Sequence, residues 1–313
     1  MLIKPKFWDY KKPNFLSYLL LIFTIPVKIN NLLLRFKPKK EFQNVKTICI
    51  GNIYIGGTGK TPTTIKLYEL LEKNRYDVLT AKKFYPSQLD EQILLKNKTN
   101  FITDKTRKKI VKTADQKKIN LVIFDDGLQD RKINYDIQFV CFDAQNWIGN
   151  GQLIPAGPLR EKLSSLKKYD AIFLKNQNQI SNDIIKSIKI HNNQILIFNT
   201  FYKIKNLKNF STSEKYLIFS GIGNPKDFKN LLIKSKLNIV DEIIFPDHYK
   251  YQNKDIEKIK KKALDLKAKI ITTEKDYVKI HNKYHDDLDF IQIDIEIENE
   301  NELITFIERK INE

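Results

Sequence analysis

The segment from Gly51 to Pro62, which reads GNIYIGGTGKTP, most limits what this chain can fold into. The apolar run Val45–Ile50 precedes it and predicts a strand, and Pro62–Lys73 predicts a helix with proline in its first turn. A glycine-rich loop between a strand and a helix surrounds phosphate groups with backbone N–H groups, and the helix dipole adds to the attraction. The segment therefore predicts a nucleotide site on a parallel α/β sheet.

The residue types inside this loop suit the binding of ATP and Mg²⁺. Gly56, Gly57 and Gly59 allow the backbone to turn tightly, so that its N–H groups point at phosphate oxygens. Lys60 is expected to reach the β- and γ-phosphates, and the Thr61 hydroxyl to bind Mg²⁺. The expected nucleotide-binding residues are Tyr54, Ile55, Gly56, Gly57, Thr58, Gly59, Lys60 and Thr61.

One position departs from the strict phosphate-loop pattern. The pattern requires glycine five positions before Gly59, where Tyr54 stands. Tyr54 must therefore adopt a backbone conformation that is open to a residue with a Cβ atom, and the Gly56–Gly57 pair could allow this. The alternative is a glycine-rich turn without a ligand. It is disfavoured because strand, loop, Gly-Lys-Thr and helix follow in the right order.

A second polar element follows the run Leu121–Gly127, which reads LVIFDDG. An apolar strand that ends in aspartate, downstream of a phosphate loop, is typical of the second element that holds Mg²⁺. Asp125 and Asp126 are adjacent carboxylates, and their repulsion would be relieved by a bound cation. The alternative is an Asp-Gly turn at a strand end. The phosphate loop upstream favours Thr61, Asp125 and Asp126 as the metal-binding residues.

Beyond residue 40 the chain alternates short apolar runs with longer amphipathic ones, which predicts a mostly parallel sheet with helices on both faces. The first part has expected strands at Asp77–Thr80, Leu121–Phe124, Ile137–Phe142 and Ala171–Leu174, and helices at Lys105–Gln116 and Leu159–Lys168. The second part has expected strands at Tyr216–Phe219, Ile239–Ile244, Ile270–Thr272 and Phe290–Ile293, and helices at Lys226–Lys234, Asp255–Lys267 and Glu300–Ile311. We expect an N-terminal segment at 1–40, a P-loop NTPase-like lobe at 41–205 and a smaller α/β lobe at 206–313.

The stretch Phe15–Leu34 is apolar, is interrupted by Pro26 and Lys28, and has lysines and an arginine on both sides. A cleaved signal peptide is disfavoured, because no small-residue cleavage site follows. A membrane span stays open. An interfacial helix on an anionic membrane surface fits best, since apolar burial and lysine attraction act together. The remaining alternative is a helix that packs on the protein's own core.

The formal net charge of +18 indicates a phosphate-rich partner or simply a lysine-rich surface. Neither zinc-finger spacing nor an RNA-binding aromatic signature accompanies the charge, so no nucleic-acid partner is expected. Cys49 and Cys141 both lie in apolar runs that predict buried strands. A disulfide framework is therefore not expected, and a reducing compartment fits.

Several segments together resemble the tetraacyldisaccharide 4′-kinase family, and the resemblance covers most of the chain. They are the phosphate loop, DDGLQDR (Asp125–Arg131), NGQLIPAGPLRE (Asn150–Glu161), GIGNPKDF (Gly221–Phe228), FPDHYKY (Phe245–Tyr251) and TTEKDYVK (Thr272–Lys279). The resemblance implies a kinase that transfers the γ-phosphoryl group of ATP to the 4′-hydroxyl of a lipid-linked tetraacyldisaccharide 1-phosphate. The product would be lipid IVA, formed at the cytoplasmic face of the inner membrane by a monomer.

The resemblance also implies roles for single residues. Asp90 and His248 would form a carboxylate–imidazole pair at the acceptor hydroxyl, and Lys60 would complete the catalytic group. Arg160 could grip a phosphate, and with Glu161 it is assigned to the substrate. Without the resemblance, His248 would be taken for a loop histidine bonded to Asp247. The segment Thr273–Asp276 is expected mainly to cap a helix.

Three departures from the family stand out. The family shows Ser-Arg-Gly-Tyr-Gly after its second strand, where this chain has Leu79–Phe84. The segment before Asp90 is shorter, and the usual histidine after the acidic pair is Asp130. Two other functions stay possible on sequence grounds: a P-loop switch or metallochaperone that acts on a protein partner, and a nucleic-acid-binding ATPase.

Overall fold

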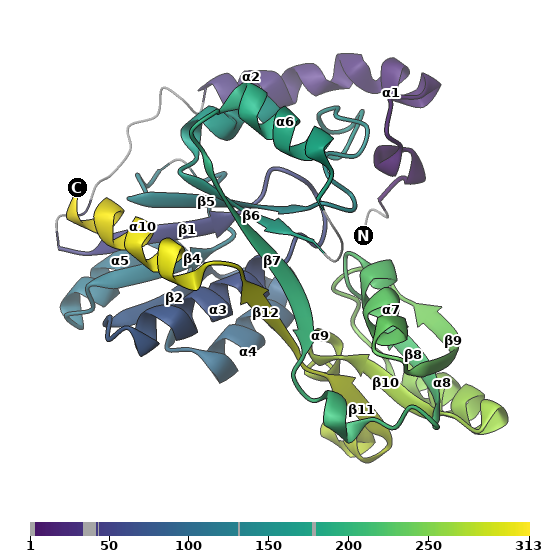
Figure 1. The fold of residues 1–313 in the computed structure, drawn as a ribbon. Helices are drawn as coiled ribbons and strands as arrows, with labels where there is room; N and C mark the ends of the chain where they lie inside the picture. The colour runs from purple at the N-terminus through teal and green to yellow at the C-terminus, as the bar shows by residue number, and fades with distance from the viewer. Residues whose placement is uncertain (1–3, 34–41, 43, 131, 177–179) are drawn as a thin grey trace. The chain divides into compact units, whose positions relative to one another are not determined.

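The computed structural model describes residues 4–33, 42, 44–130, 132–176 and 180–313, and these form two compact units (Figure 1). The larger unit comprises Leu2–Phe84, Lys98–Phe201 and Ile295–Glu313. The smaller unit comprises Tyr85–Asn97 and Tyr202–Asp294. Each unit has its own sheet and its own hydrophobic core.

The larger unit is built on an eight-stranded sheet in the order β12-β7-β6-β5-β1-β4-β2-β3. Its strands are β1 (Lys46–Gly51), β2 (Val78–Lys83), β3 (Phe101–Asp104), β4 (Leu121–Asp125), β5 (Ile137–Asp143), β6 (Ala171–Lys175), β7 (Leu196–Ile204) and β12 (Ile293–Ile297). The pairings from β3 to β7 are all parallel. Glu298 N–H donates to the Asn199 carbonyl and Lys205 N–H to the Gln292 carbonyl, so β12 runs antiparallel to β7.

Helices cover both faces of this sheet, as the alternating pattern predicts. On one face, Cys49 and Phe124 belong to the core that includes Ile110 of α5 (Arg107–Gln116) and Ile188 of α6 (Asn182–His191). On the other face lie α3 (Lys60–Lys73) and α10 (Glu300–Asn312), whose Phe306 ring meets Phe139 of β5 at 5.9 Å. The parallel strands are buried on both sides, and their carboxyl ends supply the loops of the nucleotide site.

The smaller unit has a four-stranded parallel sheet in the order β11-β10-β8-β9. Its elements are α4 (Leu89–Lys98), β8 (Lys215–Ser220), α7 (Pro225–Lys234), β9 (Asn238–Ile244), α8 (Asn253–Leu266), β10 (Lys269–Thr273), α9 (Glu274–Tyr277) and β11 (Leu288–Ile291). Alternate residues of β8 face opposite sides: Ile218 packs with Phe228 of α7, and Leu217 packs with Ile256 of α8. The unit is therefore a three-layer α/β fold.

The two units divide the chain differently from the expected boundary at 206. Tyr85–Asn97 groups with the smaller unit, while Ile295–Glu313 groups with the larger one. The C-terminal part returns because β12 pairs with β7 and Phe306 packs on the larger core. The described N-terminal residues also group with the larger unit instead of standing apart.

Two element predictions were wrong. Leu159–Lys168 is not an α-helix; only Leu163–Lys168 forms a short 3-10 helix. The segment Phe290–Ile293, expected as one strand, covers the end of β11 and the start of β12, with Gln292 between them. Four further elements, α4, β3, α6 and β7, were not predicted from the sequence.

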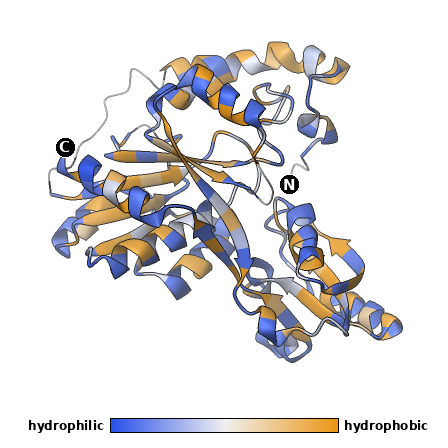
Figure 2. Cartoon of the chain, viewed as in Figure 1, coloured by the Kyte–Doolittle hydropathy of each residue, from blue (hydrophilic) through white to orange (hydrophobic). Residues whose placement is uncertain are grey.

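The N-terminal segment is helical from Phe15 to Leu33, through α1 (Phe15–Leu19), a 3-10 turn and α2 (Ile25–Leu33). Among the described residues, this is one helix that is both long enough and apolar enough to cross a membrane, judged by length and composition. Its buried residues are the polar Ser17 and Thr24, whereas most of its large apolar side chains are exposed. Figure 2 shows how much of this helix is hydrophobic. This inverted pattern contradicts the alternative of a helix packed on the protein's own core. The basic residues 35–40 lie outside the described part of the chain.

The loop of residues 150–161 holds this N-terminal segment in place. The buried Asn150 side chain donates to the Ser17 hydroxyl at 2.9 Å, and Asn150 N–H donates to the Trp8 carbonyl at 3.0 Å. Gly149 has a φ of 56°, and a Cβ atom there would lie 2.1 Å from the Trp8 carbonyl oxygen. Glycine is required at this position because the two backbones touch.

Candidate active site

The phosphate loop joins β1 to α3 in the larger unit. Gly56 and Gly59 have φ values of 140° and 82°, and Gly59 occupies the N-cap position of α3. The buried Asn52 side chain donates to the Thr58 hydroxyl at 3.0 Å, which ties the start of the loop to its end. The backbone therefore takes the turn that the glycines predict, in front of a helix N-terminus.

Tyr54 takes up the position that the strict pattern gives to glycine, without a left-handed backbone. Its ring packs with Leu153 and Leu159, and its hydroxyl donates to Asp9 Oδ1 at 2.8 Å while accepting from Lys4 Nζ at 2.5 Å. Burial, and secondarily Asp9, raise the pKa of Tyr54 far above its usual value, so the phenol keeps its proton. The prediction that this position tolerates a Cβ atom is confirmed.

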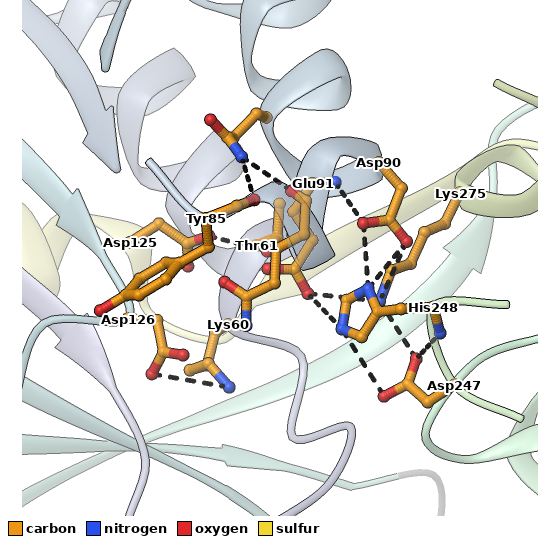
Figure 3. A network of polar contacts seen from close by, with 12 residues as sticks. Lys60, Thr61, Tyr85, Asp90, Glu91, Asp125, Asp126, Asp247, His248 and Lys275 are labelled. Atoms are coloured by element: carbon orange, nitrogen blue, oxygen red, sulfur yellow. Dashed lines mark hydrogen bonds and ion pairs between the residues drawn. The ribbon is translucent and has the colours of Figure 1, made fainter. Parts of the chain in front are cut away.

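Asp125 is fully buried at the end of β4, beside the start of α3 (Figure 3). Its Oδ2 accepts hydrogen bonds from the Thr61 hydroxyl at 2.9 Å and from Lys82 Nζ at 2.7 Å. The predicted partners Thr61 and Asp125 are therefore in contact. Lys82 was missed, because a lysine in a strand pattern gives no sign of burial.

Asp126 has a left-handed backbone with a φ of 57°. Arg107 holds it there by donating to the Asp126 carbonyl at 2.5 Å and to the Asp130 carboxylate at 2.8 Å. The Asp126 carboxylate lies 3.9 Å from Lys60 Nζ and 3.4 Å from Arg160 Nη1. The Asp126 carboxylate thus lies close to two cations, Lys60 and Arg160, that are suited to binding a phosphate. Asp130 helps to hold Asp126 indirectly, because it accepts a hydrogen bond from Arg107.

Arg160 and Glu161 have different surroundings. Arg160 N–H donates to the Ile53 carbonyl at 2.7 Å, which joins its loop to the phosphate loop, and its guanidinium reaches Gln129 Oε1 at 3.0 Å. Glu161 is buried, and its carboxylate accepts from Lys168 Nζ at 3.0 Å and from the Tyr169 hydroxyl at 3.2 Å. Glu161 thus has partners within the fold, and its assignment to the substrate stays a prediction.

Asp90 and His248 meet within the smaller unit (Figure 3). His248 Nδ1 lies 2.9 Å from Asp90 Oδ2 and 3.0 Å from Oδ1. His248 has a φ of 57°. Its backbone N–H donates to Asp247 Oδ1 at 3.0 Å and to the Gly221 carbonyl at 3.2 Å. An ionised carboxylate only accepts hydrogen bonds, so Asp90 favours a proton on Nδ1, while Nε2 lies 3.8 Å from the Glu91 and Asp247 carboxylates.

Two lysines complete this cluster. Lys275 Nζ lies 3.2 Å from Glu91 and 3.7 Å from Asp90, and Lys279 Nζ lies 3.8 Å from Asp90. Burial alone would raise the pKa of Asp90, but the hydrogen bond from His248 and the charges of both lysines lower it below its ordinary value. Asp90 is therefore ionised at neutral pH, as the proton placement on His248 requires.

The position of Lys275 was missed, although its segment was examined. Thr273 caps α9, and its hydroxyl accepts from Asp276 N–H at 3.1 Å, which confirms the capping prediction. The same turn carries Lys275 into contact with the carboxylates around His248. A capping pattern therefore concealed a charged group of the candidate site.

The metal expectation is consistent with the residues at the phosphate loop. Within the described ranges, no group of three or more His, Cys, Asp and Glu side chains could form a cage for a metal ion. Mg²⁺ in phosphate-loop sites needs no such cage, because waters and phosphate oxygens supply most ligands. In such a site the protein contributes a hydroxyl and a nearby carboxylate, as Thr61 and Asp125 do here.

Comparison with known proteins decides the family. The model of the tetraacyldisaccharide-1-P 4′-kinase family, LpxK, matches residues 14–312. The chain belongs to this family. A tetraacyldisaccharide 4′-kinase of Pelagibacter ubique is 44% identical over 96% of this chain and 95% of its own length. The corresponding protein of Rickettsia conorii is 35% identical, with 90% of both chains covered.

A solved LpxK structure shares the fold. The protein of Aquifex aeolicus, in complex with ATP, matches with a TM-score of 0.70 and 21% identity, over 95% of this chain and 99% of its own. The prediction of a mostly parallel α/β fold is thereby confirmed.

Proposed function

We propose that this chain transfers the γ-phosphoryl group of ATP to the 4′-hydroxyl of a tetraacyldisaccharide 1-phosphate, giving lipid IVA. The observation that carries the proposal is the phosphate loop with its Thr61–Asp125 contact, in a chain that matches LpxK over nearly its whole length. The chain is an enzyme of lipid A synthesis.

The larger unit would hold the phosphate donor. Loop N–H groups between Gly56 and Thr61 bind the β- and γ-phosphates. Lys60 exchanges its ion pair with Asp126 for contacts with these phosphates. Thr61 and Asp125 would hold Mg²⁺, which supplies charge neutralisation at the β- and γ-oxygens when bound. Arg160 is placed to add a second cation to the phosphates. Catalysis here consists of positioning and charge stabilisation.

The smaller unit would activate the acceptor. His248 Nε2 accepts the proton of the 4′-hydroxyl as its oxygen bonds to the γ-phosphorus, and the bond from that phosphorus to the bridging oxygen of ADP breaks. Asp90 stabilises the imidazolium that forms, and Lys275 keeps the surrounding carboxylates compensated. The proton then leaves from His248 to solvent.

The N-terminal helix would bring the enzyme to its lipid substrate. Its exposed apolar side chains and the nearby lysines 4, 6, 11, 12 and 28 fit an anionic membrane surface. We propose the cytoplasmic face of the inner membrane, where ATP is present, and a monomer as the working form. On this view the positive charge of the chain serves lipid rather than nucleic acid.

The test is transfer of label from γ-labelled ATP to the disaccharide acceptor by the full chain. We expect labelled lipid from the wild type and at least about a hundredfold less from Lys60→Ala. Lys66→Ala is the matched control, because Lys66 lies on the same helix and pairs with Glu300 at 2.8 Å. Release of the label only as inorganic phosphate, with acceptor present, would support the switch or metallochaperone alternative and overturn the proposal.

A further inference from the structure

Lys82 is a buried cation at the nucleotide site that the proposed mechanism leaves unused. Its side chain has no exposed surface, and its Nζ lies 2.7 Å from Asp125 Oδ2. That same oxygen accepts the Thr61 hydroxyl at 2.9 Å. β2 and β4 pair in parallel up to Ala81 and Phe124, so Lys82 and Asp125 are the next residues along the two strands. The strand register therefore fixes this contact.

A charge that is buried this way strongly alters its partner. A buried lysine is costly unless a carboxylate compensates it, so Lys82 and Asp125 depend on each other. The negative charge of Asp125 is also what would attract Mg²⁺ beside Thr61. An ammonium group 2.7 Å from the same oxygen reduces that attraction, and it repels the metal directly.

We propose that Lys82 is a positioning residue that holds Asp125 when no metal is bound and weakens the binding of Mg²⁺ at the nucleotide site. The inference rests on the proposed function, because it concerns the metal that accompanies ATP there. Lys82 also lies in the Leu79–Phe84 stretch where this chain departs from the LpxK pattern.

The chain contains a matched control for this pair. Lys175 of β6 and Asp143 of β5 form a second buried ion pair at 2.8 Å, also between neighbouring parallel strands. In the sheet, β1 lies between β5 and β4, so this pair is one strand removed from Asp125. A neutral substitution at Lys175 therefore reproduces the loss of a buried lysine on a strand that does not adjoin β4.

The experiment measures binding of a fluorescent ATP analogue to the full chain at increasing Mg²⁺ concentrations. We expect Lys82→Gln, which keeps a hydrogen-bond donor without the charge, to lower the half-saturating Mg²⁺ concentration by about tenfold or more. Lys82→Arg keeps the charge and should stay within about threefold of the wild type. Lys175→Gln should leave the Mg²⁺ dependence unchanged.

Thermal unfolding gives a second readout, which can be used even if the variant is less stable than the wild type. Lys82→Gln leaves Asp125 less compensated, so Mg²⁺ with the analogue should raise its midpoint more than that of the wild type. Equal Mg²⁺ dependence of Lys82→Gln and wild type, or an equal shift in Lys175→Gln, overturns the inference alone. Binding to the wild type that does not depend on Mg²⁺ overturns the proposed metal site as well.

Discussion

The Asp90 carboxylate holds His248 Nδ1 at 2.9 Å, although 158 positions separate the two residues in the chain. Both belong to the smaller unit, because Tyr85–Asn97 groups with it rather than with the sheet that surrounds it in sequence. The pairing leaves Nε2 as the basic atom of the imidazole. A long-range contact therefore selects the tautomer.

The first prediction concerns this tautomer. Asp90→Asn should lower kcat by about 10²–10⁴-fold, because an amide can donate to Nδ1 and favour the proton on Nε2. The KM for ATP should change little, since ATP is held by the larger unit. Steady-state kinetics with the disaccharide acceptor would check both constants. Asp255→Asn, which alters a helix cap at Gln252, is the control and should retain kcat. An Asp90→Asn enzyme with wild-type kcat would remove the pair from the chemistry.

The second prediction follows from the lowered pKa of Asp90. Because the folded pKa lies below the unfolded value of about 3.9, the ionised carboxylate stabilises the fold above that pH and loses this effect as the pH falls through the folded pKa. Asp90→Asn should therefore be less stable than the wild type by about 2 kcal/mol near neutral pH. The difference should shrink in acid. Denaturant unfolding at several pH values measures it, and a difference that grows in acid would contradict the assignment.

The third prediction concerns the two cysteines, which are free and buried as the sequence indicates. Burial raises the pKa of Cys141 to about 12, and it raises the pKa of Cys49 further. Both thiols should resist alkylation in the native protein at about pH 8, and they should react only after unfolding. Mass spectrometry after iodoacetamide treatment checks this. Rapid native labelling of either thiol would show that its strand opens.

The fourth prediction tests the membrane role of the N-terminal helix. Ile22→Glu with Phe23→Glu should reduce flotation with anionic vesicles by about tenfold or more, because each buried apolar side chain contributes about 1.5–3 kcal/mol. Both side chains are exposed, so the fold should be unaffected. Ile190→Glu is the control, since Ile190 is 79% exposed on α6 of the same unit. Unaltered flotation of the double variant would exclude this surface as the lipid contact.

Local patterns were sufficient for the phosphate loop and for most strands. Gly59, Lys60 and Thr61 follow a strand and open a helix in both sequence and structure. Such short-range order depends on neighbouring residues, which a sequence displays directly. The same reasoning located Asp125 at the end of a buried strand.

Tertiary contacts account for what the sequence could not show. The helix expected from Leu159 fails because Arg160 N–H bonds to the Ile53 carbonyl and Leu159 pairs with Tyr54. Burial of Lys82 depends on a strand partner far along the chain. The pairing of Asp90 with His248 was expected only from family resemblance, although His248 stands out locally in a Pro-Asp-His turn after a predicted strand.

The polar contacts of the first helix have a practical consequence for protein production. Deleting residues up to Leu33 to obtain a soluble fragment would also remove Asp9, the acceptor for the Tyr54 hydroxyl, and Ser17, the partner of Asn150. Such a fragment would lose activity through a damaged ATP loop even with a detergent-solubilised substrate. Surface substitutions, rather than truncation, are therefore the sound way to separate lipid attachment from phosphate transfer.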